Sequence, residues 1–317
     1  MRVAPSLSLA LLLLAPRATA GDALAVRVNG AWREWWHADR APVRWTAPAA
    51  TLSSALRWHP ASPGIEWGDA ELSAPVEGWR TKLVVERIDP ARHRFALQLG
   101  QGVDFAPNWA VDSAGDSVLV AVNAGQFSRM LPWGWLVNDG REITKPGTGA
   151  LSMALVFDSS GAVRFVEADS IAAERTRGHI ANAFQSYPAL LTGDGDVPEL
   201  LRSTVASTDI DLAHRDSRVA IGETRDGRIL IAMTRFNALG EAAAKIPFGL
   251  TVPEMSALMG ALGCRRAVSL DGGISGQLAV REPAGEVRKW TAWRFVPLGL
   301  LVLPKLASSP GTYRSTR

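Results

Sequence analysis

Short apolar runs separated by turn residues recur along most of the sequence, and they restrict the chain to a fold rich in antiparallel strands. Residues 154–168 (ALVFDSSGAVRFVEA) and 218–236 (RVAIGETRDGRILIAMTRF) each contain two such runs joined by a tight turn. This pattern is typical of β-hairpins. The regular alternation of strands and helices that builds a parallel sheet is missing. We therefore expect an α+β fold with a mixed, mostly antiparallel sheet and a few packed helices.

One helix is clearly indicated over residues 252–262. Thr251 and Glu254 have the spacing of a capping box, with proline in the first turn between them. Apolar residues follow at helical spacing on one face: Met255, Leu258, Met259 and Leu262. Gly263 is a natural stop for this helix, and the chain then enters the predicted strand before Asp271.

The N-terminus has the pattern of a secretory signal peptide. Arg2 precedes a short apolar stretch at residues 7–15, and Ala18-Thr19-Ala20 resembles a cleavage site. The stretch is shorter than the about 20 residues that span a bilayer. We expect residues 1–20 to be removed and the protein to be exported, periplasmic or extracellular, without stable membrane insertion.

Composition divides the rest of the chain. Seven of the twelve tryptophans lie in residues 21–80, which we expect to form a Trp-rich N-terminal arm. Residues 81–305 are the predicted main domain and residues 306–317 a flexible tail. The tryptophans of the arm either stack against sugar rings or pack over the core, and we favour packing.

Charge and cysteine content exclude several classes of protein. The formal net charge is +3 with no basic run, so a nucleic-acid partner is not expected. Cys264 is the single cysteine, which excludes an intrachain disulfide, and we expect it to be a buried small hydrophobe. No metal-binding motif is present, and we take the GDGD sequence at 193–196 as a turn rather than a calcium loop. No metal or cofactor is expected.

The most informative stretch is AVSLDGGISGQL at residues 267–278. Asp271 ends an apolar strand, and Gly272 and Gly273 follow at once. Glycines here permit close approach of backbone N–H groups to a bound anion, and Ser275 adds a hydroxyl. A carboxylate held beside an anion site suits acid–base or nucleophilic chemistry. An ordinary tight turn is the alternative.

A second strand end of this kind occurs at AVNAGQF, residues 121–127. Asn123 stands where the other strand end has an acid. Its amide either binds sugar hydroxyls and phosphate oxygens or caps a turn through its own backbone.

Six segments in order resemble the phosphodiester glycosidase family, over about residues 80–304. They are AVNAGQF (121–127), LPWGWLVNDG (131–140), AFQSYPALLTGDG (183–195), SRVAIGETRDGRILI (217–231), GLTVPEMSALMGALGC (249–264) and AVSLDGGISGQL (267–278). The positions that match the family pattern are Asn123, Gly125, Gln185, Pro188, Arg218, Gly222, Asp271, Gly272, Gly273 and Ser275.

Four positions depart from that pattern: Ala124, Gln126, Val219 and Ile274. Ile274 replaces a glycine directly after the two that follow Asp271. A β-branched residue does not easily adopt a positive φ, so we expect the rim of the anion site to differ in shape from that of the family.

The resemblance implies cleavage between the anomeric carbon of a sugar and a phosphodiester oxygen. Arg218 is then the expected phosphate ligand, with a surface arginine paired to Asp216 as the alternative. Asp271 is the expected nucleophile or general acid/base, and Asn123 orients a sugar hydroxyl. The expected substrate-binding residues are Gly125, Gln126, Gln185, Gly272, Gly273 and Ser275.

Glycoside cleavage usually employs two carboxylates. Glu223, Asp194 and Asp211 are candidates for the second, and the sequence does not rank them. A serine hydrolase motif is excluded because Gln277 stands where G-x-S-x-G requires glycine.

The predicted function is therefore an exported hydrolase of sugar-1-phosphodiester linkages in envelope or extracellular glycans, with a glycan or sugar phosphate as its partner. A non-catalytic glycan-binding or polysaccharide-assembly protein on the same fold is the alternative. A hydrolase of ordinary glycosides or phosphodiesters is a third possibility.

Overall fold

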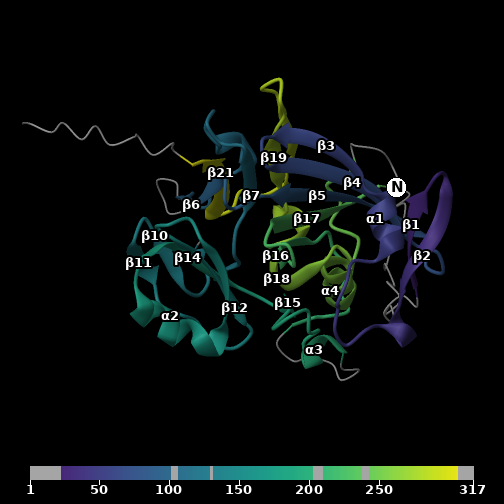
Figure 1. Ribbon diagram of the computed structural model, residues 1–317, viewed down its shortest axis with the longest axis horizontal. Helices are drawn as coiled ribbons and strands as arrows, with labels where there is room; N and C mark the ends of the chain where they lie inside the picture. The colour runs from purple at the N-terminus through teal and green to yellow at the C-terminus, as the bar shows by residue number, and fades with distance from the viewer. Residues whose placement is uncertain (1–22, 101–105, 129–130, 203–209, 238–242, 306–317) are drawn as a thin grey trace, which may run out of the picture.

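The computed structural model describes residues 23–100, 106–128, 131–202, 210–237 and 243–305. The predicted signal peptide and the whole of the predicted tail lie outside these ranges. Three large sheets pack around a common interior, with short helices on their outer faces (Figure 1).

The largest sheet has nine strands. Its order is β15-β18-β16-β17-β5-β4-β1-β2, with β3 also paired to β4. The strands are β1 (Ala23–Val28), β2 (Ala31–His37), β3 (Arg57–Ser62), β4 (Ile65–Ala74), β5 (Trp79–Ile88), β15 (Ala189–Leu191), β16 (Val219–Thr224), β17 (Ile229–Phe236) and β18 (Cys264–Leu270).

Two five-stranded sheets and a small hairpin complete the β structure of the described ranges. One sheet has the order β11 (Arg141–Thr144), β10 (Leu136–Asn138), β14 (Ile180–Ser186), β12 (Met153–Asp158) and β13 (Val163–Glu167). The other has the order β20 (Val287–Trp290), β19 (Leu278–Arg281), β7 (Val120–Asn123), β21 (Leu298–Pro304) and β6 (His93–Leu99). The hairpin pairs β8 (Phe127–Ser128) with β9 (Leu131–Pro132).

Every strand pairing among the described residues is antiparallel. The expectation of a mostly antiparallel fold with few helices is confirmed, although the parallel pairs of a mixed sheet are not found in these ranges. Both predicted hairpins form, as β12–β13 and β16–β17.

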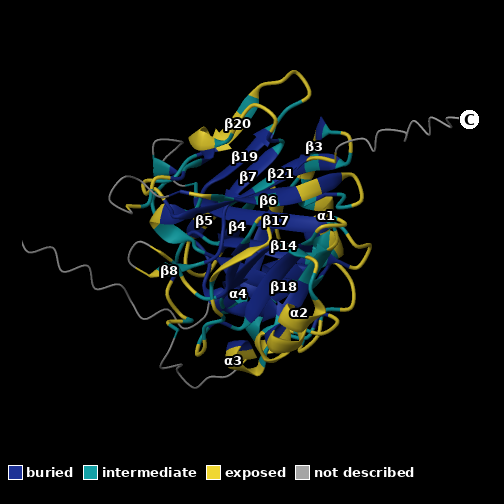
Figure 2. Cartoon of the chain, turned by 90° about the vertical axis from the view of Figure 1, so that its left-hand side faces the viewer, coloured by how far each residue is buried: buried dark blue, intermediate teal, exposed yellow. Residues whose placement is uncertain are grey.

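The main core lies between the three sheets. Alternate residues of a strand face opposite sides, so Val219 and Ile221 of β16 enter this core while Ala220 between them faces the helices. All three sheets contribute side chains to the same cluster, for example Val84, Leu155 and Val122. In Figure 2 buried residues fill the strands, and exposed residues gather in the connecting loops.

The α-helices of the described residues are short and lie outside the sheets. They are α1 (Ala50–Ala55), α2 (Ile171–Arg177), α3 (Glu199–Arg202) and α4 (Val252–Ala261). The predicted capping box of α4 is present, with the Thr251 side chain accepting from the Glu254 N–H. Almost every residue of α4 is buried, so the helix presents more than the single apolar face that the sequence indicates.

The N-terminal segment is built into the nine-stranded sheet. β4 pairs with β5 along its whole length, and β1 and β2 extend the sheet beyond β4. The boundary expected near residue 80 therefore falls inside β5, close to its start. Several tryptophans of the segment are buried, as packing over the core requires: Trp36, Trp67 and Trp79.

None of the helices in the described ranges has the length and apolar character needed to cross a bilayer.

Candidate functional site

The candidate site lies where the ends of three strands from three sheets meet. β18 ends just before Asp271, β7 ends at Asn123, and β14 ends at Ser186. The N–H of Asp271 donates to the carbonyl of Gly125 at 3.0 Å, and the Ser186 hydroxyl donates to the carbonyl of Ser269 at 2.6 Å. These bonds join the sheets directly beside the Asp271 carboxyl group.

Asn123 holds the turn that carries Asp271. Its Nδ2 donates to the carbonyl of Asp271 at 2.6 Å, and its Oδ1 accepts from the N–H of Gln277 at 2.9 Å. The residue is 1% exposed. Because both ends of the amide bind the main chain, Asn123 positions Asp271, which argues against its expected role of orienting a sugar hydroxyl.

Gly272 and Gly273 allow a neighbouring segment to approach closely. A Cβ at position 272 would collide with the carbonyl oxygen of Ser217, and one at position 273 would lie 2.7 Å from Oδ2 of Asp216. The N–H of Gly273 donates to the Ser217 carbonyl at 2.8 Å. This N–H is therefore not available to an anion, which corrects its expected role, and the glycines bring Asp216 to the Asp271 turn.

Asp216 is the second carboxyl group of the site. Its Oδ1 accepts from the N–H of Ser217 at 2.8 Å, and its Oδ2 faces Gly273. Sequence reasoning treated Asp216 only as a partner for Arg218. The signal that would have identified it is its place two residues before Arg218 and three residues before β16, which pairs with β18.

Both carboxyl groups have raised pKa values. Burial raises the pKa of Asp271 to about 6, and the charge of Asp216 acts in the same direction. A hydrogen bond from the Ser275 hydroxyl and the charge of Arg294 oppose this rise. Burial also raises the pKa of Asp216, against the charges of Arg218 and His214. Two neighbouring half-buried acids with raised pKa values, one of them under the charge of the other, are suited to proton transfer.

Each of the three carboxylates considered from sequence is held by other contacts of its own. Val219 pairs with Leu270 beside the site, whereas Glu223 lies four residues further along β16, about 13 Å away, and forms ion pairs with two arginines of β18. Asp194 is paired with Arg225 at 2.7 Å. Asp211 accepts N–H bonds from its own turn.

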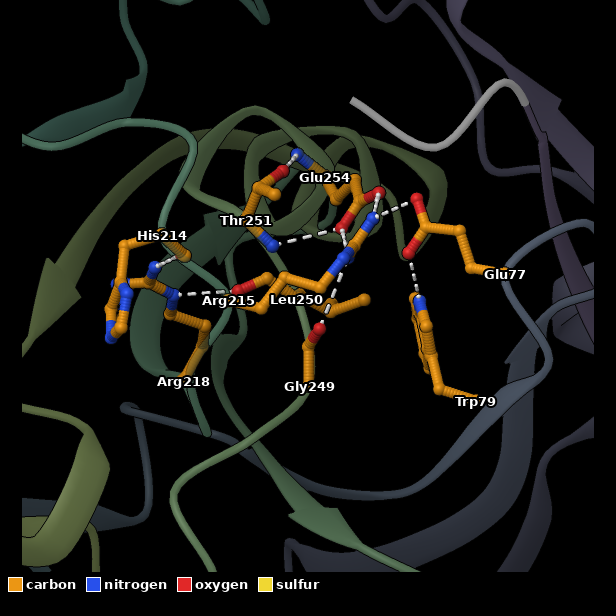
Figure 3. Close-up of polar contacts among 9 residues, drawn as sticks. All are labelled: Glu77, Trp79, His214, Arg215, Arg218, Gly249, Leu250, Thr251 and Glu254. Atoms are coloured by element: carbon orange, nitrogen blue, oxygen red, sulfur yellow. Dashed lines mark hydrogen bonds and ion pairs between the residues drawn. The ribbon is translucent and has the colours of Figure 1, made fainter. Parts of the chain in front are cut away.

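Arg218 binds main-chain carbonyls. Its Nε donates to the carbonyl of Leu250 at 2.9 Å, and its Nη2 donates to that of His214, as Figure 3 shows. Burial lowers the pKa of Arg218, although the charges of Asp216 and Glu254 oppose this. Arg218 therefore fixes the segment that carries Asp216, which argues against its expected role as a phosphate ligand.

A buried ion-pair network anchors the same segment (Figure 3). Arg215 donates to both oxygens of Glu254 at 2.7 and 3.0 Å and to Glu77 at 2.7 Å. Glu77 also accepts from the indole of Trp79 at 2.7 Å. Breaking such a pair leaves an uncompensated buried charge, so the main chain next to Asp216 is tightly constrained.

Gln185 also makes its hydrogen bonds within the chain. Its Oε1 accepts from the N–H groups of Trp135 and Gly147 at 3.0 and 2.9 Å. Its Nε2 donates to the carbonyls of Gly147 and Leu151 at 3.2 and 3.1 Å. These bonds give Gln185 a structural role and argue against its expected role in substrate binding.

The remaining predicted residues border the turn. Gly125 has a φ of +64°, and Gln126 donates to the carbonyl of Tyr187 at 3.3 Å. Tyr187 lies close enough to Asp271 that burial, together with the charge of that carboxylate, raises the pKa of its phenol. These contacts place Gln126 and Tyr187 on one side of the site.

Ile274 causes no backbone strain. It lies in a 3₁₀ turn, Gly273–Ser275, and it is not among the residues with positive φ. The substitution instead places an apolar side chain, 40% exposed, at the rim.

Within the described ranges, no group of three His, Cys, Asp or Glu side chains is arranged to hold a metal ion.

Two half-buried carboxyl groups next to strand ends, with the charge of Asp216 acting on Asp271 and an arginine charge acting on each, define a candidate acid–base site of the kind that hydrolases use. The family model for phosphodiester glycosidases matches residues 116–303, more than half of the chain, and this range includes Asn123, Asp216 and Asp271. The chain belongs to the phosphodiester glycosidase family, which confirms the resemblance found in its sequence.

Solved structures show the same fold. The zebrafish N-acetylglucosamine-1-phosphodiester alpha-N-acetylglucosaminidase catalytic domain, auto-inhibited by its pro-peptide, matches with a TM-score of 0.59 at 16% identity, covering 84% of this chain and 94% of that one. A hypothetical protein from Synechocystis matches with a TM-score of 0.53 at 15% identity, covering 79% of this chain and 64% of that one. No curated protein matches the chain.

Proposed function

We propose that the protein is an exported hydrolase that cleaves sugar-1-phosphodiester linkages in envelope or extracellular glycans. Family membership supports a phosphodiester glycosidase. The observation that carries the proposal is the pair formed by Asp216 and Asp271, two acids with raised pKa values that Gly273 brings together at one turn.

The reaction breaks the bond between the anomeric carbon and the phosphodiester oxygen. The oxygen of a water molecule becomes the anomeric hydroxyl group, and the bonding electrons leave with the phosphate. One of the two water protons stays on the sugar, and the other is released to the phosphate or to solvent through an acid–base group. Because the phosphate is a stable anion, it needs electrostatic stabilisation more than protonation.

The two acids suit different parts of this reaction. Asp271 retains its proton up to about pH 6 and is assigned the role of general acid/base. Asp216 lies near the positive charges of Arg218 and His214, which favour its ionised form. It is assigned the role of the carboxylate that acts on the water or on the anomeric carbon.

Export is proposed from the signal-peptide pattern of residues 1–20. An exported enzyme would meet envelope and extracellular glycans, which accounts for the proposed class of substrate.

The alternative is a glycan-binding protein without catalysis. A binding protein would have no need of a second buried acid at the turn, and burying an acid without using it lowers stability. The presence of Asp216 therefore favours the enzyme.

The test is hydrolysis of UDP-N-acetylglucosamine and a panel of other sugar-1-phosphodiesters by the wild type, Asp271→Asn and Asp216→Asn. Release of free sugar by the wild type alone, with both variants folded, supports the proposal. Saturable binding without turnover by the wild type favours the glycan-binding alternative, and full activity of Asp271→Asn would refute the assigned chemistry.

A further inference from the structure

The segment of Trp293, Arg294 and Phe295 presents an unusual surface beside the Asp271 turn. Trp293 is 60% and Phe295 58% exposed, although both are large apolar side chains. The N–H groups of Trp293 and Arg294 each donate to the carbonyl of Ile274 at 3.1 Å. Because Ile274 belongs to the turn after Asp271, the segment is attached directly to the candidate site.

The guanidinium group of Arg294, on this segment, is available to bind a ligand. The group lies 4.9 Å from the ring centroid of Phe127, in cation–π geometry. In the part of the chain that the structure describes, it makes no hydrogen bond or ion pair. Its charge acts on Asp271, whose pKa it lowers against the effect of burial. Five N–H donors in a fixed fork therefore remain for a ligand close to the acid.

Three other cations near the turn, within the described ranges, are engaged with the protein. Arg218 donates to two carbonyls. Arg235 donates to the carbonyl of Thr291 at 3.0 Å, and Lys245 donates to that of Ala292 at 3.2 Å. Arg235 and Lys245 thus hold the chain that leads into Trp293 and support the segment rather than face a ligand.

We propose that Arg294 is the residue that binds the substrate's phosphate and selects a phosphodiester over a neutral glycoside. A planar guanidinium fixed on an aromatic ring matches two phosphate oxygens. It also meets the charge that develops on the leaving phosphate. The exposed indole of Trp293 and the exposed ring of Phe295 flank the bound group with apolar faces. This inference rests on the proposed function.

Removing the charge-assisted hydrogen bonds between Arg294 and the phosphate should lower the catalytic efficiency substantially. Arg294→Met should lower kcat/KM for UDP-N-acetylglucosamine by about 10- to 100-fold, and Arg294→Lys should retain part of the activity. Salt should weaken phosphodiester binding in the wild type more than in Arg294→Met. Arg33→Met, an exposed arginine on β2 at the far edge of the nine-stranded sheet, is the matched control.

Two readouts separate this inference from the proposed function. The first is turnover of UDP-N-acetylglucosamine. The second is binding of UDP-N-acetylglucosamine, measured by calorimetry, to Asp271→Asn and to Asp271→Asn/Arg294→Met. A neutral methyl glycoside of the same sugar is the comparison ligand. We expect Arg294→Met to weaken phosphodiester binding selectively and to leave binding of the neutral glycoside unchanged.

The possible outcomes distinguish the two claims. Turnover that Arg294→Met leaves unchanged overturns the inference and leaves the function standing. Arg294-dependent binding without turnover in the wild type overturns the function and leaves the inference standing. An equal loss for the phosphodiester and the neutral glycoside would show a structural role for Arg294, and absence of both turnover and binding overturns both claims.

Discussion

At the scale of single residues, the Asp271 carboxyl group lowers the stability of the fold at neutral pH. Its folded-state pKa of about 6 exceeds the usual value near 4. The stability associated with its bound proton is fully present below pH of about 4 and is lost as pH rises through about 6. An ionised acid in this buried turn is tolerated, we infer, because the reaction uses it.

The first prediction follows from the stability that is lost when Asp271 ionises in the folded protein. Asp271→Asn should abolish turnover and raise the free energy of unfolding at pH 7 by about 1–2 kcal/mol, as measured by urea denaturation. At pH 4 the gain should vanish. Asp116→Asn, at an exposed position, is the control, and a destabilised Asp271→Asn at pH 7 would contradict the raised pKa.

Ser275 influences the pKa of the Asp271 carboxyl group. Its hydroxyl hydrogen bond lowers the pKa of Asp271, so Ser275→Ala should raise that pKa and move the alkaline limb of the pH–rate profile to higher pH. The profile of kcat/KM between about pH 4 and 9 measures the shift. A limb that stays in place or moves to lower pH would show that Asp271 does not set it.

At the scale of elements, the site depends on how closely β16 and β18 approach at their common end. Gly273→Ala would place a methyl group 2.7 Å from the Asp216 carboxylate, at a φ of +57°. We expect at least a 10-fold loss of kcat because Asp216 must move.

Gly227→Ala is the matched control for that variant. Gly227 also has a positive φ, +81°, but nothing lies within 4 Å of the position that an added methyl group would occupy. Gly227→Ala should lose about 1 kcal/mol of stability, as Gly273→Ala should, and it should keep its activity. Equal activity losses in the two variants would show that strain, rather than displacement of Asp216, is responsible.

Elements that are marked by a short motif in their own sequence could be predicted. The capping box at Thr251 located the start of α4, and the two hairpins followed from their turns. Asp216 was missed because its importance depends on the pairing of Val219 with Leu270, which joins residues about fifty positions apart and leaves no local mark. Likewise, the roles of Asn123 and Gln185 follow from hydrogen-bond partners that sequence pattern does not reveal.

At the scale of the whole molecule, the three-sheet core encloses an acid that the candidate site does not use. Glu86 of β5 is fully buried, and neither of its carboxyl oxygens has a hydrogen-bond partner among the described residues. Burial raises its pKa well above the usual value. The N-terminal segment helps to bury it, because Trp67 of β4 is its pairing partner.

The ionisation of Glu86 should contribute to the pH dependence of the stability of the fold. The stability linked to its proton is present below pH of about 4 and lost as pH rises toward its folded-state pKa. Glu86→Met, of similar volume, should raise the thermal midpoint at pH 8 and reduce the difference between pH 5 and pH 8. The exposed Glu286→Gln serves as control, and an unchanged difference in Glu86→Met would refute this role.

The central claim is that the paired acids cleave the bond at the anomeric carbon of a sugar phosphodiester. The most direct measurement is hydrolysis of a sugar-1-phosphodiester in water enriched in heavy oxygen, followed by mass spectrometry of both products. The account predicts that the label enters the sugar, that the phosphate stays unlabelled, and that Asp271→Asn gives neither product. Label in the phosphate would show cleavage at phosphorus and would contradict the account.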